Sequence, residues 1–140
     1  MLKKADLKKI AKTRLAEARI LCQKKHCKYE GVIHLCGYAV EIAFKKKICD
    51  ALNWADFPET KNEFKGLKSF KTHELPILLK LSGQELKLKK NPNLFADWSN
   101  ILQNLNPKIR YSPIGKVTPA QAKITIDATY ELLKFLEVIR

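Results

Sequence analysis

Apolar side chains recur at helical spacing along most of the chain. A long amphipathic helix is predicted over residues 2–25, where lysines cover most of the surface and one face is apolar: Leu7, Ile10, Ala11, Ala18, Leu21 and Cys22. A second helix, about 29–52, is apolar nearly all round from Val32 to Phe44, which is typical of a helix at the centre of a bundle. Because Gly37 costs helix stability there, we expect a neighbouring element to approach it closely.

Turn residues interrupt the pattern after the second helix. Residues 53–72 contain Pro58 and Gly66 and predict an irregular segment, which the sequence leaves open as a lid or a packed spacer. A short helix from about His73 to Ser82 is expected next, with Thr72 as its N-cap and Gly83 as its stop.

Capping residues mark two further helices. Asn91-Pro92 predicts a helix start, and Pro107 forbids its continuation. Thr118-Pro119-Ala120-Gln121 is a capping box, and it predicts a last helix that runs to Arg140. Since no long β-type alternation occurs, we expect one all-α domain over residues 1–140, an antiparallel bundle of four to five helices.

Charge changes this picture more than composition does. The 140 residues are 46% hydrophobic, enough to build a core and too many for disorder. Lys and Arg number 27 against 14 Asp and Glu, a net charge of +13, and residues 1–28 alone carry ten basic and two acidic side chains, a net of 10 − 2 = +8. Such a segment attracts polyanions, although a merely well-solvated face has the same composition.

Targeting and metal-binding signals are weak. The chain lacks a membrane-length apolar run and a signal-peptide block, so a cytoplasmic protein without membrane association is expected. The four scattered cysteines indicate reduced thiols. Cys22 and His26 are one helical turn apart, but a second ligand pair at finger spacing is missing, so we expect neither a metal nor a cofactor.

One polar stripe crosses the apolar second helix. At about 100° per residue, it consists of four side chains: His34, Tyr38, Glu41 and Lys45. A carboxylate among apolar neighbours is costly unless a cation or several donors meet it, so Glu41 must face water in a groove, Arg110 or a lysine. The stripe is equally consistent with a buried ion pair that fixes helix register, or with the solvent edge of the helix.

Arg110 and Tyr111 are the second candidate pair. Apolar neighbours on either side would hold the Arg110 guanidinium in place, where it can bind a phosphate, while Tyr111 can stack on a base. Alternatively, Arg110 pairs with Glu41 and Tyr111 fills the core. His73, at a predicted helix start, either caps that helix or faces a ligand.

Three motifs resemble those of HEPN domains. Residues 29–46 contain Gly-Tyr-Ala-Val-Glu followed by lysines, like the second-helix signature of that family. Residues 70–79 contain Thr-His-Glu-Leu, similar to the family's helix start, and Ile109-Arg110-Tyr111 precedes the last helix, where the family has its arginine. The resemblance implies an antiparallel helical bundle, homodimers, RNA or nucleotide association, and in many members a toxin paired with a nucleotidyltransferase antitoxin.

The chain departs from the family's catalytic pattern. Many members cleave RNA with an arginine followed, after four to six residues, by a histidine. Counted from Arg110, those positions hold Gly115, Lys116 and Val117. Without this general acid or base, the usual RNase route loses a principal group. His73 or His34 can replace it only if the fold brings one of them near Arg110.

The sequence therefore predicts a HEPN-type domain that binds RNA or a nucleotide. Arg110 contacts phosphate, Glu41 positions it, and Tyr111 with nearby lysines completes the groove. One alternative is a metal-independent endoribonuclease toxin that uses Arg110 with another histidine such as His73. The other is a protein–protein module that dimerises through the apolar second helix and docks an acidic antitoxin on the basic first helix.

Overall fold

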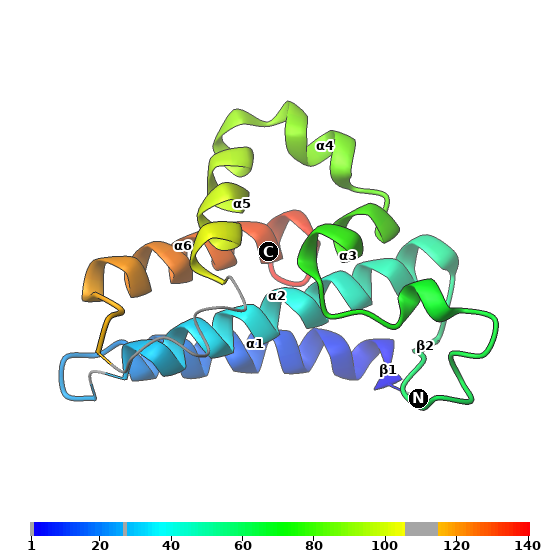
Figure 1. Ribbon diagram of the computed structural model, residues 1–140, viewed down its shortest axis with the longest axis horizontal. Helices are drawn as coiled ribbons and strands as arrows, with labels where there is room; N and C mark the ends of the chain where they lie inside the picture. Colours follow the sequence, from blue (N-terminus) through cyan, green and yellow to red (C-terminus); the bar gives the residue numbers. More distant parts are fainter. Residues whose placement is uncertain (1, 27, 106–114) are drawn as a thin grey trace.

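The computed structural model describes residues 2–26, 28–105 and 115–140. These contain six α-helices, one 3₁₀ turn and two short strands in chain order: β1 (Leu2–Lys3), α1 (Lys4–Leu21), α2 (Tyr29–Leu52), β2 (Asp56–Phe57), η1 (Lys68–Phe70), α3 (Leu75–Leu81), α4 (Glu85–Lys90), α5 (Pro92–Asn104) and α6 (Pro119–Phe135). The two long helices α1 and α2 lie side by side and antiparallel, α6 lies along α2, and α3, α4 and α5 form an arch over α2 (Figure 1). The all-α class predicted from periodicity is confirmed.

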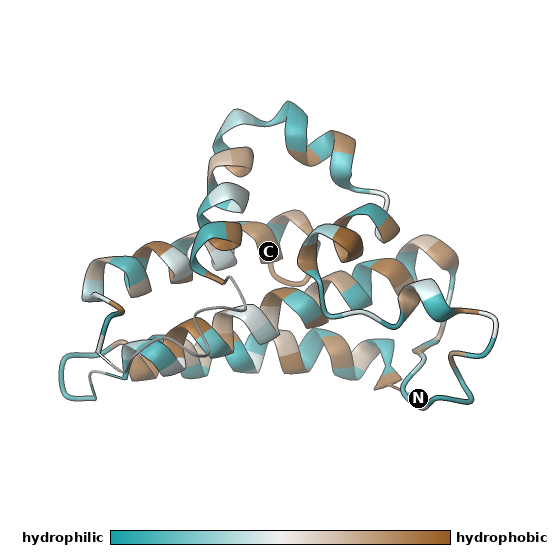
Figure 2. Ribbon diagram, viewed as in Figure 1, coloured by the Kyte–Doolittle hydropathy of each residue, from teal (hydrophilic) through white to brown (hydrophobic). Residues whose placement is uncertain are grey.

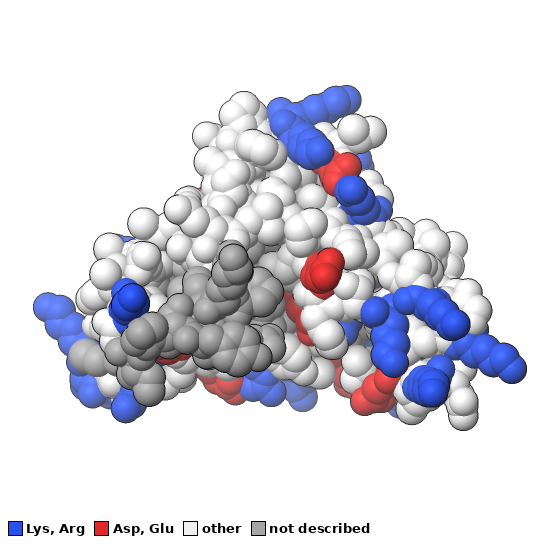
Figure 3. Space-filling view, viewed as in Figure 1, with Lys and Arg blue, Asp and Glu red and all other residues white. Residues whose placement is uncertain are grey.

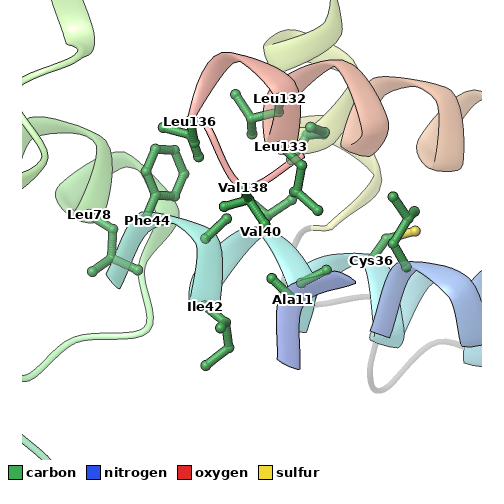
Figure 4. Close-up of a cluster of buried hydrophobic side chains, with 14 of the residues drawn as sticks. Ala11, Cys36, Val40, Ile42, Phe44, Leu78, Leu132, Leu133, Leu136 and Val138 are labelled. Carbon is green, nitrogen blue, oxygen red and sulfur yellow. The ribbon is translucent and has the colours of Figure 1, made fainter. Parts of the chain in front are cut away.

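Helix α2 is at the centre of the packing. It contacts α1, α3 and α6, and apolar residues occupy most of its length (Figure 2). In the close-up of Figure 4, Val40 and Phe44 of α2 point toward side chains of the C-terminal helix and of the segment that follows it, such as Leu132, Leu136 and Val138. The Phe44 ring also meets Trp98 of α5 edge to face, with centroids 5.7 Å apart. Burial on several sides explains why α2 is apolar nearly all round.

This burial bears on the dimerisation hypothesis. From Val32 to Phe44, the apolar side chains of α2 pack inside this chain and not on its surface, Leu35 being only partly buried. In this chain the other helices therefore already cover most of the apolar positions of α2. A dimer through α2 stays a prediction from the sequence.

Local signals placed several helix ends correctly. The Asn91 side chain accepts a hydrogen bond from Leu94 N at 3.1 Å, and Thr118 and Gln121 form the reciprocal capping box. Gly83 has φ +74°, which suits a helix stop. At Gly37, a Cβ would lie 3.6 Å from Leu105 Cδ2, an ordinary van der Waals contact, so the end of α5 is the neighbour there but does not require a glycine.

The N-terminus differs from the prediction of a helix over 2–25. Leu2 and Lys3 are extended and pair antiparallel with Phe57 and Asp56. α1 therefore begins only at Lys4, and it ends at Leu21. The pairing is a tertiary contact between distant segments, which helical periodicity does not report.

Two further helix boundaries were predicted wrongly. α3 begins at Leu75 after the extended residue Glu74, so Thr72 is not its N-cap; its hydroxyl accepts a hydrogen bond from Glu74 N instead. α6 ends at Phe135 and does not continue to Arg140, because Glu137 takes a left-handed conformation with φ 61°. This turn buries Val138 and lets its amide donate to Leu133 O at 2.9 Å.

Residues 53–72 form a packed spacer. Asn53 ends α2 in a left-handed conformation with φ 55°. Phe57 is fully buried, and its ring contacts those of Trp54 and Phe64. Trp54 in turn contacts Phe70, so aromatic side chains hold both ends of the segment. The segment consequently delivers residues 71–74 to the side of α2.

None of the described helices combines the length and the apolar character that crossing a membrane requires. Helix α4 was not predicted, because its six residues are too few for the periodicity to show.

Candidate functional site

A buried carboxylate on α2 meets an exposed histidine from a distant segment. Glu41 has only 9% of its surface exposed. Its Oε1 lies 2.5 Å from His73 Nδ1, and its Oε2 lies 3.7 Å from Lys45 Nζ. Because an unpaired carboxylate would be costly at this depth, the two cationic or donor partners explain how α2 tolerates Glu41.

His73 is held by one ring nitrogen and is open to solvent elsewhere. It stands two residues before α3, in the extended stretch that follows the packed spacer, and it does not cap the helix. Its side chain is 81% exposed. Contact with a carboxylate through Nδ1 favours the tautomer that leaves Nε2 free. A neutral ring then accepts a proton at Nε2, whereas a protonated ring donates one there.

Lys45 is the third member of the cluster. It lies one turn after Glu41 on α2 and has 9% of its surface exposed. Its Nζ stands 5.4 Å from the centroid of the buried Phe57 ring. The ring and the carboxylate together stabilise an ammonium group that has little contact with water.

The N-terminal half of the predicted stripe is exposed to solvent. His34 and Tyr38 are exposed, Tyr38 by 45%. The Arg14 guanidinium lies 5.8 Å from the Tyr38 ring centroid, and its Nη1 bonds Glu17 at 2.6 Å. The four stripe residues therefore do not share one environment, since Glu41 and Lys45 are buried and the other two face solvent.

Arg110 and Tyr111 lie outside the described residues. Their predicted roles stay predictions from the sequence. The described residues on either side of this segment both contact α2. Leu105 packs at Gly37, and Gly115 N donates to Glu30 Oε1 at 2.6 Å. The hydrogen bond from Gly115 lowers the pKa of the Glu30 carboxyl below its usual value.

The described cysteine thiols have a packing role. Cys22, Cys36 and Cys49 are free thiols, and burial raises the pKa of Cys36 and of Cys49 to about 11. Such thiols are poor nucleophiles at neutral pH. Among the described residues, no three His, Cys, Asp or Glu side chains converge as metal ligands.

Basic side chains gather at several places on the molecule. On the face shown in Figure 3, Lys and Arg lie over α4, over the spacer that leads to α3 and at the opposite end of the molecule. The Glu41 carboxylate is balanced by Lys45, so protonation of His73 leaves one net positive charge at the cluster. The cluster can thus attract an anion and exchange a proton with it.

Sequence reasoning identified Glu41, Lys45 and His73 singly but did not join Glu41 to His73. The sequence predicted Arg110 or a lysine as the partner of Glu41, and of these the described residues show Lys45. Glu41 and His73 are 32 positions apart, and only the packed spacer brings them together.

No protein-family model, curated protein or solved structure matches the chain. The HEPN resemblance therefore stays a prediction from the sequence motifs.

Proposed function

We propose that this chain is a HEPN-type domain that binds RNA or a nucleotide, with His73 as a phosphate contact. The observation that carries the proposal is the Glu41–His73 pair, a buried carboxylate that holds one nitrogen of an exposed imidazole. Homodimerisation and a nucleotidyltransferase-type antitoxin belong to the same proposal and depend on the family resemblance.

The pair suits phosphate binding because the carboxylate restricts the ring without covering it. A protonated imidazole held in this way donates from Nε2 in a fixed direction, and a hydrogen bond between charged groups is stronger than one between neutral groups. The net charge of +13 adds a long-range attraction for any polyanion. Arg110, predicted from the sequence to contact phosphate, would supply a further cation.

The experiment compares His73→Ala with His26→Ala. Both remove an exposed imidazole, but His26 lies in the turn after α1 and not beside Glu41. With a short fluorescein-labelled single-stranded RNA, and separately with ATP, we expect His73→Ala to weaken binding about tenfold, the loss of roughly 1.4 kcal/mol that one charged hydrogen bond provides. His26→Ala should bind like the wild type. Equal affinities of all three proteins for both ligands would contradict the assignment of His73.

A second candidate function, RNA cleavage, is favoured by the same pair. A histidine oriented by a carboxylate is the usual arrangement for proton transfer. In the proposed reaction the ribose 2′-oxygen attacks the adjacent phosphorus and the bond from phosphorus to O5′ breaks. His73 Nε2 takes the proton of the 2′-hydroxyl, and the O5′ leaving group gains a proton from water. The products are a 2′,3′-cyclic phosphate and a 5′-hydroxyl.

Product analysis separates cleavage from binding. Incubation of RNA with the wild-type protein and a chelator should yield 2′,3′-cyclic phosphate ends, and His73→Ala should slow their appearance by 10² to 10⁴, the typical contribution of one acid–base group. RNA that binds with wild-type affinity and stays intact would leave binding as the function and exclude cleavage.

A further inference from the structure

Three exposed cations lie in a row along α1. At about 100° per residue, Lys8, Lys12 and Arg19 fall within about 40° of one another around the helix. The core-facing positions of α1, such as Leu7 and Ala11, occupy the neighbouring sector. The row is therefore a basic edge of α1.

A matching row runs along α6. Lys123, Tyr130 and Lys134 also fall within about 40° of one another, and both lysines are exposed. The two rows meet at Tyr130: the Arg19 Cζ lies 5.1 Å, and the Lys134 Nζ 5.5 Å, from the centroid of its ring. The surface that these six side chains form is called the α1–α6 basic surface below.

Two cations contact the Tyr130 ring. The Arg19 and Lys134 head groups each lie against the ring, which attracts them through its electron-rich π system. A phosphate that reaches this ring meets cations from both helices, and the guanidinium can contact it through two parallel hydrogen bonds.

The cations of this surface have no carboxylate partners. Among the described residues, none forms an ion pair with Lys8, Lys12, Arg19, Lys123 or Lys134. Pairing was available locally, because Asp127 follows Lys123 by four positions and Glu131 precedes Lys134 by three.

The two carboxylates of α6 also act on α5. Burial, and then the negative charges of Glu131 and Asp127, raise the pKa of Asp97 above its usual value. Asp127 lies within about 40° of Lys123 around α6, yet among the described residues neither it nor Glu131 forms an ion pair with a cation of the basic surface.

We propose that the α1–α6 basic surface binds the phosphate backbone of a nucleic-acid strand. The inference rests on the proposed RNA-binding function and adds to it a contact surface distinct from the Glu41–His73 pair. Recognition is by charge and not by base sequence, since each cation contributes one phosphate contact and releases one condensed counterion. Single-stranded RNA long enough to reach both places is the expected ligand.

The test measures RNA affinity as a function of salt. The double variant Arg19→Gln with Lys134→Gln should lower the slope of log affinity against log salt by about 1.4, which is about 0.7 for each of two phosphate contacts to a single strand. Affinity at low salt should fall at least tenfold. The control is Lys87→Gln with Lys90→Gln on α4, which removes the same charge from exposed positions elsewhere.

Two single variants test the role of the ring. Tyr130→Leu removes the group that gathers the cations and should weaken binding about two- to threefold. Tyr130→Phe keeps the aromatic face and should bind like the wild type. Circular dichroism and thermal melting of each variant establish that the helical fold is retained.

The outcomes distinguish this surface from the His73 site. Equal effects of the two double variants would overturn the proposal, because net charge alone would then explain them. A second result would also overturn the proposal. If the double variant of Arg19 and Lys134 keeps its RNA affinity but no longer binds phosphatidylserine vesicles, the ligand of this surface is a membrane. If His73→Ala weakens RNA binding and the double variants do not differ, the surface fails but the proposed function stands. The reverse pattern supports the surface and overturns the His73 site.

Discussion

Helix α2 carries two carboxylates that each meet two basic groups, and the two clusters differ in what they leave open. Glu41 bonds Lys45 of its own helix and His73 of the segment before α3. Asp50 bonds Lys46 of its own helix at 2.6 Å and Lys4 of α1 at 3.3 Å. In the Asp50 cluster both partners are lysines from the α1–α2 pair, so the contact joins two helices that already pack together.

The difference lies in the exposed partner. His73 is 81% exposed, and the second nitrogen of its ring can act as a donor or as an acceptor, whereas the ammonium groups of Lys4 and Lys46 can only donate. The Asp50 pKa reflects a structural role: burial alone would raise it, but the hydrogen bond and charge of Lys46, and then those of Lys4, lower it below its usual value. We therefore place the candidate site at Glu41 and not at Asp50, because only His73 leaves an exposed ring nitrogen beside a buried carboxylate.

Removal of each carboxylate should separate the clusters by stability. We expect Glu41→Ala to lower the free energy of unfolding by about 2–3 kcal/mol, because Lys45 then keeps a buried charge without a carboxylate. Asp50→Ala should cost about 1 kcal/mol, because Lys46 still donates to Glu137 O and Lys4 can reach water. Urea denaturation of both variants measures the difference. Equal losses of unfolding free energy would show that the two carboxylates contribute equally to stability despite their different burial.

Isosteric variants should separate the clusters by function. Glu41→Gln keeps the shape of the side chain but not the charge that holds His73, so RNA affinity should fall about fivefold, or roughly 1 kcal/mol. Asp50→Asn should stay within about twofold of the wild type. Each change removes one negative charge, which by itself favours RNA binding. A loss in Glu41→Gln alone would therefore isolate the positioning of His73, and equal affinities would exclude it.

Acid should affect the Asp50 contact in a direction set by its lowered pKa. A carboxyl with a lowered pKa in the folded protein contributes stability above its unfolded pKa of about 3.9 and loses it as the pH falls through the folded value. The difference in unfolding free energy between wild type and Asp50→Asn should thus be about 0.5–1 kcal/mol at neutral pH and shrink toward zero in acid. Urea melts at stepwise lower pH follow it. If the difference in unfolding free energy stays constant as the pH falls, the lowered pKa of Asp50 does not contribute to stability.

Much of the fold was predictable because its signals are local. Capping residues act within one helical turn, so Asn91 and Thr118 fixed the starts of α5 and α6 correctly. Boundaries that depend on distant packing were missed. The extended start at Leu2 depends on its pairing with Phe57, and the end of α6 depends on the burial of Val138.

The candidate site divides in the same way. Periodicity alone placed Glu41 and Lys45 on one stripe of an apolar helix, and burial cost alone required a partner for the carboxylate. That the partner includes His73 was decided by the tertiary structure, because the aromatic contacts of Phe57 and Trp54 pack the spacer and carry residue 73 back to α2. The two basic rows show the same division. The spacing of residues within each helix predicts each row, but only the packing of α1 against α6 places Arg19 and Lys134 at Tyr130. Sequence by itself determined the long helices and the need to neutralise a buried charge, since both follow from local spacing. Which distant side chains meet was decided by the tertiary structure, since it depends on how the helices and the spacer pack.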